Sequence, residues 1–251
     1  QDKSPRDWIF NEFSPLGTYT GLPIDHEQFL PVVEYQNNNG FDRWDCVSMA
    51  ILNWLEVRLK ELALIEYNFS DRFLAVGSGT KIKVGNSVAT VFDFLRDYNS
   101  VYETDYPDVK TAEEFYKPIP EELFEKALLT VLKDYKIYRE WINPYNRKDI
   151  EEALRETPLP VTVAYASGGE KDILKPTTKY NHEVLLYGLT GAGHYKIFDH
   201  VVNSRKIYHK DYIFGSILKP TIILKEKLMI FKPTNNELYL LVEGNEQRLA
   251  M

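Results

Sequence analysis

The chain has 251 residues, of which 44% are hydrophobic and 14% aromatic, so it can bury a sizeable core in one large domain or in two lobes that share a cleft. Its formal charge of −7, from 30 basic and 37 acidic residues, argues against nucleic acid or another polyanion as partner. No apolar run approaches the length that crosses a membrane, so we expect no membrane insertion.

The first half of the chain is predicted to be mainly helical. Residues 1–35 are rich in Pro and turn residues and predict an extended arm. From Val47 to Leu62 the apolar residues recur with the period of one helix face. A shorter helix is predicted to start in "NFSDRFLAV", and a Gly-rich loop spans 77–87. Two more helices are predicted, one over 87–98 with Ser87 as N-cap and one over 119–135 with Pro120 in the first turn.

After about residue 155 the pattern changes to short strands rich in β-branched and aromatic residues. These strands are "LPVTVAYA", "HEVLLYGL", "HYKIFDH", "TIILKEKLMIF" and "NELYLLVEG". Helices first and strands later indicate an α+β protein with a helical lobe over about 30–135 and a β lobe over about 155–235 plus the N-terminal arm. We interpret 236–251, with a turn at Gly244-Asn245, as the start of a further module that the chain truncates.

Cys46 is the only cysteine, so no internal disulfide can form, and a reducing compartment suits the chain. It immediately precedes the first apolar position of the long predicted helix. There the unpaired N–H groups and the helix macrodipole favour a thiolate, which is the nucleophilic form of cysteine. Two interpretations follow from this position: Cys46 is a small core residue, or it is a nucleophile that needs a general base close by.

His182 is the histidine best placed to be that base. It begins the apolar strand "HEVLLYGL", and Asp199 ends the strand "HYKIFD" seventeen residues later. If the two strands are antiparallel neighbours joined by "TGAG", Asp199 lies beside His182, accepts from its imidazole N–H and fixes the tautomer. Taken singly, such a histidine is more often structural and such an aspartate is more often part of a turn, and it is the joint order of thiol, imidazole and acid that favours catalysis.

This order resembles that of the papain-like cysteine proteases. In that family the nucleophile lies near the start of a central helix, with the histidine about 130–150 residues downstream, and here His182 lies 136 positions after Cys46. "NHEVLLYGL" is similar to the family's segment around its histidine, and "YKIFDH" to the strand that ends in the third catalytic residue. Independently, "GNSVATVFDFLRDYNSVYETDYP" (85–107) resembles the Gly-rich loop, helix and Tyr-Pro turn of the nucleophile lobe.

The resemblance implies a papain-like two-lobe α+β fold, with Cys46 on the helical lobe and with His182 and Asp199 on an antiparallel sheet or barrel lobe. It implies an oxyanion hole built from the Cys46 N–H and an upstream amide, which is Gln36 or one of the three residues Asn37, Asn38 and Asn39. It also implies that Gly85 and Asn86 line the substrate groove, where a substrate backbone pairs with theirs, and that Asn181 helps to bind substrate.

The chain also departs from the family pattern. Asp199 stands where the family usually has Asn, and no Trp follows it; "DRWDCVSM" replaces the usual residues around the cysteine. Asp45, next to the thiol, is expected to raise the thiol pKa unless it points away or is offset by Arg43. These departures resemble divergent bacterial or phage-encoded members, so we expect a cytoplasmic or virion-associated protein rather than a lysosomal one.

The leading functional hypothesis is therefore hydrolysis of peptide bonds in a peptide or protein substrate through a covalent acyl-enzyme. The alternatives are a peptidoglycan amidase or endopeptidase, a transglutaminase-type acyl transferase with the same triad, and an inactive papain-like module that joins a larger assembly through its termini. We predict no cofactor and no metal: His194 and His200 lie six residues apart on a strand but lack the further ligands that zinc requires.

Overall fold

The computed structural model of the protein describes residues 8–9, 24–37, 40–164, 180–201 and 204–225, together with the backbone of strands at 228–232, 237–242 and 245–248. The helices are α1 (Cys46–Ala63), α2 (Asp71–Gly77), α3 (Val88–Tyr98), α4 (Ala112–Phe115), α5 (Glu121–Ala127) and α6 (Arg147–Glu156). Short 3-10 turns lie at η1 (Glu27–Phe29) and η2 (Val131–Asp134).

The strands form three separate sheets. They are β1 (Trp8–Ile9), β2 (Tyr135–Trp141), β3 (Leu159–Val163), β4 (His182–Leu189), β5 (Tyr195–Phe198), β6 (Arg205–Tyr208), β7 (Leu218–Leu224), β8 (Leu228–Lys232), β9 (Glu237–Val242) and β10 (Asn245–Arg248). The strand orders are β1-β2-β7, β3-β4-β5-β6 and β10-β9-β8. Every pairing is antiparallel except that of β1 with β2.

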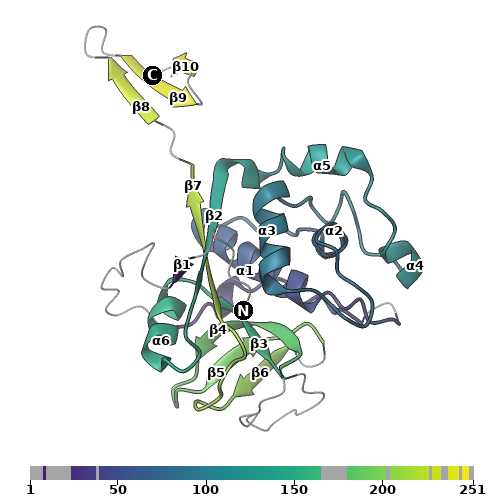
Figure 1. The fold of residues 1–251 in the computed structure, drawn as a ribbon. Helices are drawn as coiled ribbons and strands as arrows, with labels where there is room; N and C mark the ends of the chain where they lie inside the picture. Colours follow the sequence, from purple (N-terminus) through teal and green to yellow (C-terminus); the bar gives the residue numbers. More distant parts are fainter. Residues whose placement is uncertain are drawn as a thin grey trace.

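Two lobes meet along α1, as Figure 1 shows. Helices α2 to α5 lie on one side of the molecule, and strands β3 to β6 with α6 lie on the other. The long antiparallel pair of β2 and β7 runs between them, and a bridge from Val161 to Ile217 joins β3 to the chain just before β7. The α+β class and the two-lobe arrangement predicted from the sequence are therefore confirmed.

Strand β4 is buried on both faces, and this fixes the relation between the lobes. Leu185 and Tyr187 pack into the core that contains α1, whereas Val184 and Leu186 pack into the core of the β lobe. A strand that is covered on both sides shows a continuous apolar run, as "VLLYGL" does. Because α1 packs against β4, the first residue of the helix lies near the first residues of the strand.

The long helix follows the predicted pattern closely. It begins at Cys46 and buries residues along its length, including Ile51, Trp54 and Leu55, which are completely inaccessible to solvent. Trp54 also donates from Nε1 to Thr157 Oγ1 (2.8 Å), which ties α1 to the segment leading into β3. Leu62, predicted to lie on the buried face, is 52% exposed because the last turn of the helix extends beyond the core.

The helix predicted over 119–135 was wrong in its second half. Helix α5 ends at Ala127, where Thr130 bonds the Ala127 carbonyl through both its backbone N–H and its side chain. The chain then makes the short turn η2 and enters β2, with Pro120 as the N-cap rather than inside the first turn. Thr and Val at 130–131 favour this change because β-branched residues lose side-chain freedom in a helix.

Strand β2 and helix α6 were not predicted. Strand β2 carries charged side chains, which in a sequence are typical of an exposed segment. Two of them, Arg139 and Glu140, are in fact fully buried. Arg139 pairs with Asp93 of α3 (3.3 Å) and also donates to Ala89 O (2.7 Å), and Glu140 pairs with Lys219 of β7 (3.2 Å), so both charges are compensated. The alternation of apolar and polar residues that identifies a strand is lost when buried positions hold ion pairs.

The predicted strand "TIILKEKLMIF" is in fact two strands. Its first part belongs to β7, which pairs with β2, and its second part is β8, which pairs with β9. Strand β9 pairs in turn with β10, with Asn245 opposite Val242, so the predicted reversal near Gly244-Asn245 is present; residues 243–244 themselves lie outside the described residues. Most of the predicted arm at 1–35 also lies outside them.

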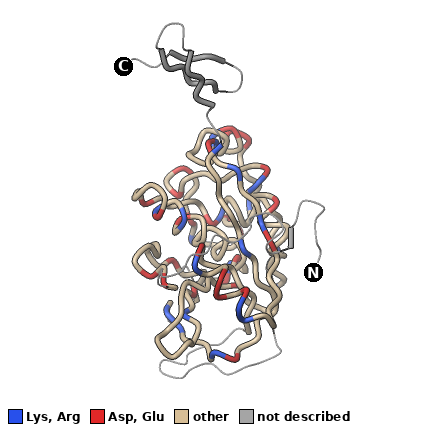
Figure 2. Tube along the Cα trace, turned by 90° about the vertical axis from the view of Figure 1, so that its left-hand side faces the viewer, with Lys and Arg blue, Asp and Glu red and all other residues tan. Residues whose placement is uncertain are grey.

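Acidic and basic residues are interspersed over both lobes (Figure 2). Within the described part of the chain, no helix is both long and apolar enough to span a bilayer.

Helix α3 offers a direct test of the predicted local structure. The Ser87 hydroxyl accepts from the Thr90 N–H (3.1 Å), as an N-cap does. We expect Ser87→Ala to lower the free energy of unfolding by about 1 kcal/mol in a denaturant titration, and Ser87→Asp to retain most of it. Equal stability of the Ala and Asp variants would contradict the capping role.

Candidate active site

A cleft of about 860 Å³ opens between the two lobes at the start of α1. Six of the residues predicted to act in catalysis or binding line this cleft: Cys46, His182, Gln36, Gly85, Asn86 and Asn181. Asp199, the seventh, lies behind His182 and is completely buried. The thiol on the helical lobe and the imidazole on the β lobe therefore face one shared space, although 135 residues lie between them in the chain.

Cys46 is the first residue of α1 and is partly exposed. Burial of the sulfur raises the thiol pKa to about 12, and the nearby carboxylates of Glu183 and Asp45 act in the same direction. Hydrogen bonds from the backbone amides of Glu183 and Val47 oppose that rise. The Glu183 amide is the one that follows His182 in the chain, so the sulfur lies against the start of β4. With this pKa the thiol is protonated at neutral pH.

Asp45 does not point away from the thiol into solvent. Its side chain is buried and forms an ion pair with Arg43 (Nε to Oδ2, 3.1 Å), which in turn binds Asp108 (2.8 Å). Burial raises the pKa of Asp45 to about 6, while Arg43 lowers it. Arg43 therefore keeps Asp45 largely ionised at neutral pH. Arg43 offsets only part of the effect of this carboxylate, because Asp45 still raises the pKa of Cys46.

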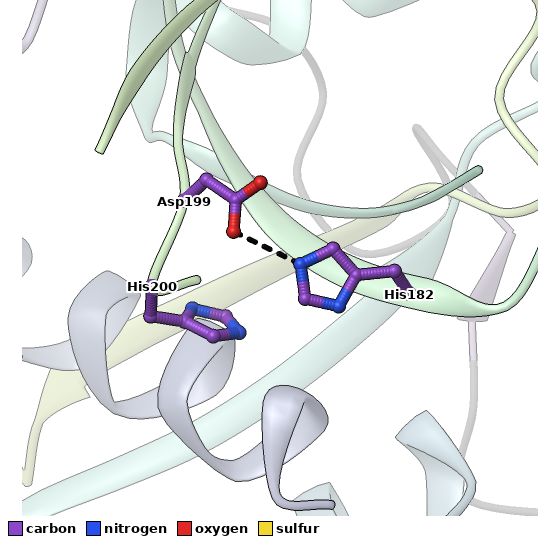
Figure 3. A group of neighbouring side chains, drawn as sticks. All are labelled: His182, Asp199 and His200. Carbon is purple, nitrogen blue, oxygen red and sulfur yellow. Dashed lines mark hydrogen bonds and ion pairs between the residues drawn. The ribbon is translucent and has the colours of Figure 1, made fainter. Parts of the chain in front are cut away.

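His182 and Asp199 are in direct contact, as Figure 3 shows. Nε2 of His182 donates to Asp199 Oδ1 (2.9 Å), and the antiparallel pairing of β4 with β5 brings the two residues together. Although burial alone would raise the pKa of Asp199, the hydrogen bond and charge of His182, with His200 and Lys206, hold it well below its usual range. Asp199 is therefore an anion that fixes the ring of His182.

Lys206 supplies the counter-charge that makes this buried anion tolerable. Its ammonium group lies 2.6 Å from Asp199 Oδ2 and is almost completely buried. The Val201 N–H donates to Oδ1 (3.0 Å), so both carboxylate oxygens are bonded. A buried carboxylate without such partners would cost several kcal/mol, on the order of the stability of a whole domain. Lys206 comes from β6, a strand that sequence reasoning did not identify.

His200 lies beside the pair with its ring edge toward His182, at 5.2 Å between ring centroids. It is 1% exposed, and neither of its ring nitrogens has a hydrogen-bond partner among the described residues. Burial lowers the pKa of His200 to about 3, and the charge of His182 acts in the same direction, so the ring is neutral.

His182, Asp199 and His200 form the one group in the described chain whose ligand atoms lie close enough to hold a metal ion, within 4.8 Å of one another (Figure 3). The carboxylate of this group is already bonded to Lys206, His182 and the Val201 amide. An incoming cation would have to displace the Lys206 ammonium, so the donor set fits a positioned imidazole better than a metal centre. His194, considered with His200 in the sequence, instead stacks on His209.

Gln36 lines the same cleft as Cys46 and is held by hydrogen bonds of both its backbone and its side chain. Its backbone N–H donates to His200 O (2.9 Å), and its Nε2 donates to Asp42 Oδ1 (2.7 Å). The same Asp42 oxygen accepts from the Trp44 N–H (2.8 Å). Asn37 is exposed, and the two alternatives Asn38 and Asn39 lie outside the described residues.

The loop at 77–87 forms one wall of the cleft, but the backbone groups of Gly85 that were expected to bind substrate are hydrogen-bonded within the loop. The Gly85 N–H donates to Lys81 O (2.8 Å), and Gly85 O accepts from the Lys81 N–H (3.1 Å). The Asn86 amide donates to Ser78 O and Ser78 Oγ (both 3.0 Å), which anchors the loop. The expected pairing of a substrate backbone with the Gly85 N–H is therefore not available in this conformation. Asn181 is exposed at the opposite wall.

Sequence reasoning missed two charged residues of the site, Lys206 and Glu183. In each case a signal was present. Lys206 and Tyr208 alternate as inward residues of a short strand, and Glu183 interrupts an otherwise apolar strand immediately after the candidate base. A charged residue at a position that the pattern assigns to the interior is a marker of a functional or ion-paired site.

Comparison with known structures defines the fold of the chain. It resembles the bromelain protease of Ananas comosus in complex with the E64 inhibitor (TM-score 0.59, 15% identity, 78% of this chain and 97% of that one). It also resembles digestive procathepsin L 3 of Tenebrio molitor larval midgut (0.61, 14%, 86% and 74%). A third is the proform of the Amb a 11 cysteine protease, a ragweed pollen allergen (0.62, 16%, 84% and 69%).

The chain therefore has the fold of the papain-like cysteine proteases, as its sequence predicted. No protein-family model and no curated protein sequence matches it. At these identities the comparison establishes the architecture, and the roles of individual residues rest on the geometry described above.

The neutral buried state of His200 makes stability depend on pH. The pKa of a histidine is about 6.5 when unfolded and about 3 here, so the unfolded chain binds the extra proton between these values. The contribution is fully present above pH 6.5 and is lost as the pH falls toward 3. The free energy of unfolding of the wild-type protein should therefore fall between pH 6.5 and pH 4. We expect this fall to be smaller in His200→Phe, by on the order of 1–3 kcal/mol, as measured by denaturant titration at the two pH values. An identical pH profile for both proteins would contradict this assignment.

The carboxylate of Asp45 predicts a measurable effect on the thiol. We expect Asp45→Asn to lower the apparent pKa of Cys46 by roughly one unit, because it removes a like charge beside the thiolate. The measurement is the pH dependence of iodoacetamide alkylation of the folded protein. Asp108→Asn is the matched control, because it also removes a partner of Arg43 but is not among the groups that raise the thiol pKa. An equal shift in both variants would assign the effect to Arg43 rather than to Asp45.

Proposed function

We propose that this protein is a cysteine endopeptidase that hydrolyses peptide bonds through Cys46 and His182. The observation that carries the proposal is the shared cleft, in which a thiol at a helix N-terminus faces an imidazole fixed by a buried carboxylate. The papain-like fold supports it, since the similar structures include cysteine proteases, one of them in complex with E64.

In this proposal Cys46 attacks the scissile carbonyl, and Nδ1 of His182 takes the thiol proton. Nδ1 is assigned this role because Nε2 is committed to Asp199. His182 then gives the proton to the leaving amine, and water hydrolyses the acyl-enzyme with His182 as base. Asp199 orients the ring throughout.

The oxyanion hole is assigned to the Cys46 backbone N–H and to Gln36. The Gln36 amide nitrogen has two hydrogens, of which one goes to Asp42, so the other can donate to the developing oxyanion. Its bond to Asp42 and the backbone bond to His200 O hold the side chain at the cleft wall before substrate arrives. A donor fixed in advance needs no reorganisation during the reaction, which is what an oxyanion hole requires.

The raised pKa of Cys46 favours a second candidate, a papain-like module that binds peptides without cleaving them. A thiol with a pKa of about 12 is almost entirely protonated at neutral pH and is a weak nucleophile. In an active enzyme, transfer of the thiol proton to His182 must therefore accompany the attack. Transfer of the acyl group to an amine, or cleavage of cell-wall peptides, uses the same three side chains and remains a variant of the first proposal.

The test combines covalent labelling with hydrolysis. We expect E64 to label Cys46 in the protein, and His182→Ala to lower both the labelling rate and kcat/KM on quenched fluorescent peptides by about two to four orders of magnitude. His209→Ala is the matched control, because His209 lies outside the cleft and stacks on His194. Protein-derived and cell-wall-derived peptides are assayed side by side.

Three outcomes separate the candidates. Labelling that persists at the same rate in His182→Ala removes His182 as the base. Binding of peptides to the cleft with no cleavage of any substrate establishes the binding module instead. Transfer of the acyl group to an added amine in preference to water reassigns the reaction to acyl transfer.

A further inference from the structure

Glu183 is a buried carboxyl in the wall of the cleft that the proposed mechanism does not use. It is the second residue of β4 and is 3% exposed. It shares the strand face of Leu185 and Tyr187, which pack against α1, and this places it on the side of Cys46. It lines the same cleft as Cys46 and His182.

The carboxyl group of Glu183 is only partly bonded. The Thr162 side chain, on the neighbouring position of β3, hydrogen-bonds it and lowers its pKa. Its Oε1 atom has no hydrogen-bond partner among the described residues. Burial has a larger effect than this hydrogen bond and raises the pKa of Glu183 to about 8, so Glu183 is mainly the neutral acid at pH 7. A buried carboxyl oxygen without a partner is costly unless the site receives one.

The other charged groups of the cleft do not supply that partner. Asp42 is the second acid in the lining, and it is bonded to Gln36 and Trp44. Among the described residues of the lining, Lys83 is the only lysine or arginine, and it is exposed on the opposite wall formed by the loop. Two buried cations of the site region, Arg43 and Lys206, are bound to Asp45 and Asp199. Asp45, the other buried acid beside Cys46, also lacks hydrogen-bond partners among the described residues, but it is paired with Arg43. Glu183 is bonded only by the neutral Thr162 side chain.

We propose that Glu183 is a specificity-determining residue that binds a cationic side chain, arginine or lysine, of the peptide substrate. The inference rests on the proposed function only in taking the occupant of the cleft to be a peptide. A guanidinium or ammonium group would bond Oε1 and neutralise the carboxylate, which a neutral or acidic side chain does not do.

The same contact would couple recognition to reactivity. The ionised Glu183 carboxylate opposes formation of the Cys46 thiolate, and a bound cation cancels that effect. Above pH 8, where Glu183 is ionised even without a ligand, a substrate with the matching charge therefore meets a more acidic thiol than a substrate without it. Discrimination would then be expressed in kcat as well as in KM.

The test uses peptides that are identical except at one position near the scissile bond, which holds arginine, lysine, norleucine or glutamate. Binding is measured first with Cys46→Ala, which cannot form an acyl-enzyme, so this arm does not require catalysis. We expect the arginine or lysine peptide to bind at least about tenfold more tightly than the norleucine peptide at one position. This ratio should rise from pH 6 to pH 9 as Glu183 ionises.

Glu183→Gln, which keeps the shape and removes the charge, should reduce that ratio to near one, both in binding and in kcat/KM. Asp42→Asn is the matched control from the same cleft and should preserve the ratio. If Glu183→Gln does not fold, the rise of the ratio with pH in the Cys46→Ala protein decides the question alone. Norleucine and arginine peptides that bind equally at every position from pH 6 to pH 9 would overturn the inference.

The two proposals fail separately. A cationic preference in binding without any hydrolysis retains the role of Glu183 and removes the protease. Hydrolysis without any preference among the four peptides retains the protease and removes the role of Glu183.

Discussion

The contact between α1 and β4 is the interaction on which the rest of the structure depends. Strand β4 is covered by α1 on one face and by the β-lobe core on the other, so neither lobe completes its core without this strand. The contact aligns the first residue of the helix with the first residues of the strand. The cleft, and the position of Cys46 and His182 on its two walls, are thus consequences of apolar burial. No separate hinge or linker is needed to form this polar site.

Around that junction the chain buries several charges and compensates most of them in pairs. Asp199 is held between His182 and Lys206, and Asp45 is paired with Arg43. The family that the chain resembles usually places a neutral Asn where Asp199 stands. Because the Lys206 ammonium lies 2.6 Å from the carboxylate, the Asp–Lys pair has no net charge and can orient the imidazole much as an amide would. Lys206 thus compensates the negative charge that Asp199 introduces in place of a neutral Asn.

The sequence predicts the parts of this fold that follow a regular pattern. The helix at Cys46, the Ser87 cap and the antiparallel pair that joins His182 to Asp199 are all present, because periodicity and capping are local properties. Strand β2 was missed because Arg139 and Glu140 occupy buried positions, and their partners Asp93 and Lys219 lie far away in the chain. Lys206 was missed for the same reason, because only the fold brings it to its partner Asp199. Glu183 was missed although a charged residue inside an apolar strand is a local signal.

The charges near Cys46 present a conflict that decides how the site works. A helix N-terminus and two backbone amides favour the thiolate, whereas burial, Asp45 and Glu183 oppose it, and the opposing effects prevail in the empty cleft. Two carboxyl groups beside a thiol work against formation of its thiolate. Asp45 is accounted for by Arg43, which it binds within the loop before α1. Glu183 is bonded by Thr162, but its Oε1 atom has no hydrogen-bond partner among the described residues. Under the proposal above, a cation that arrives with the ligand takes this place.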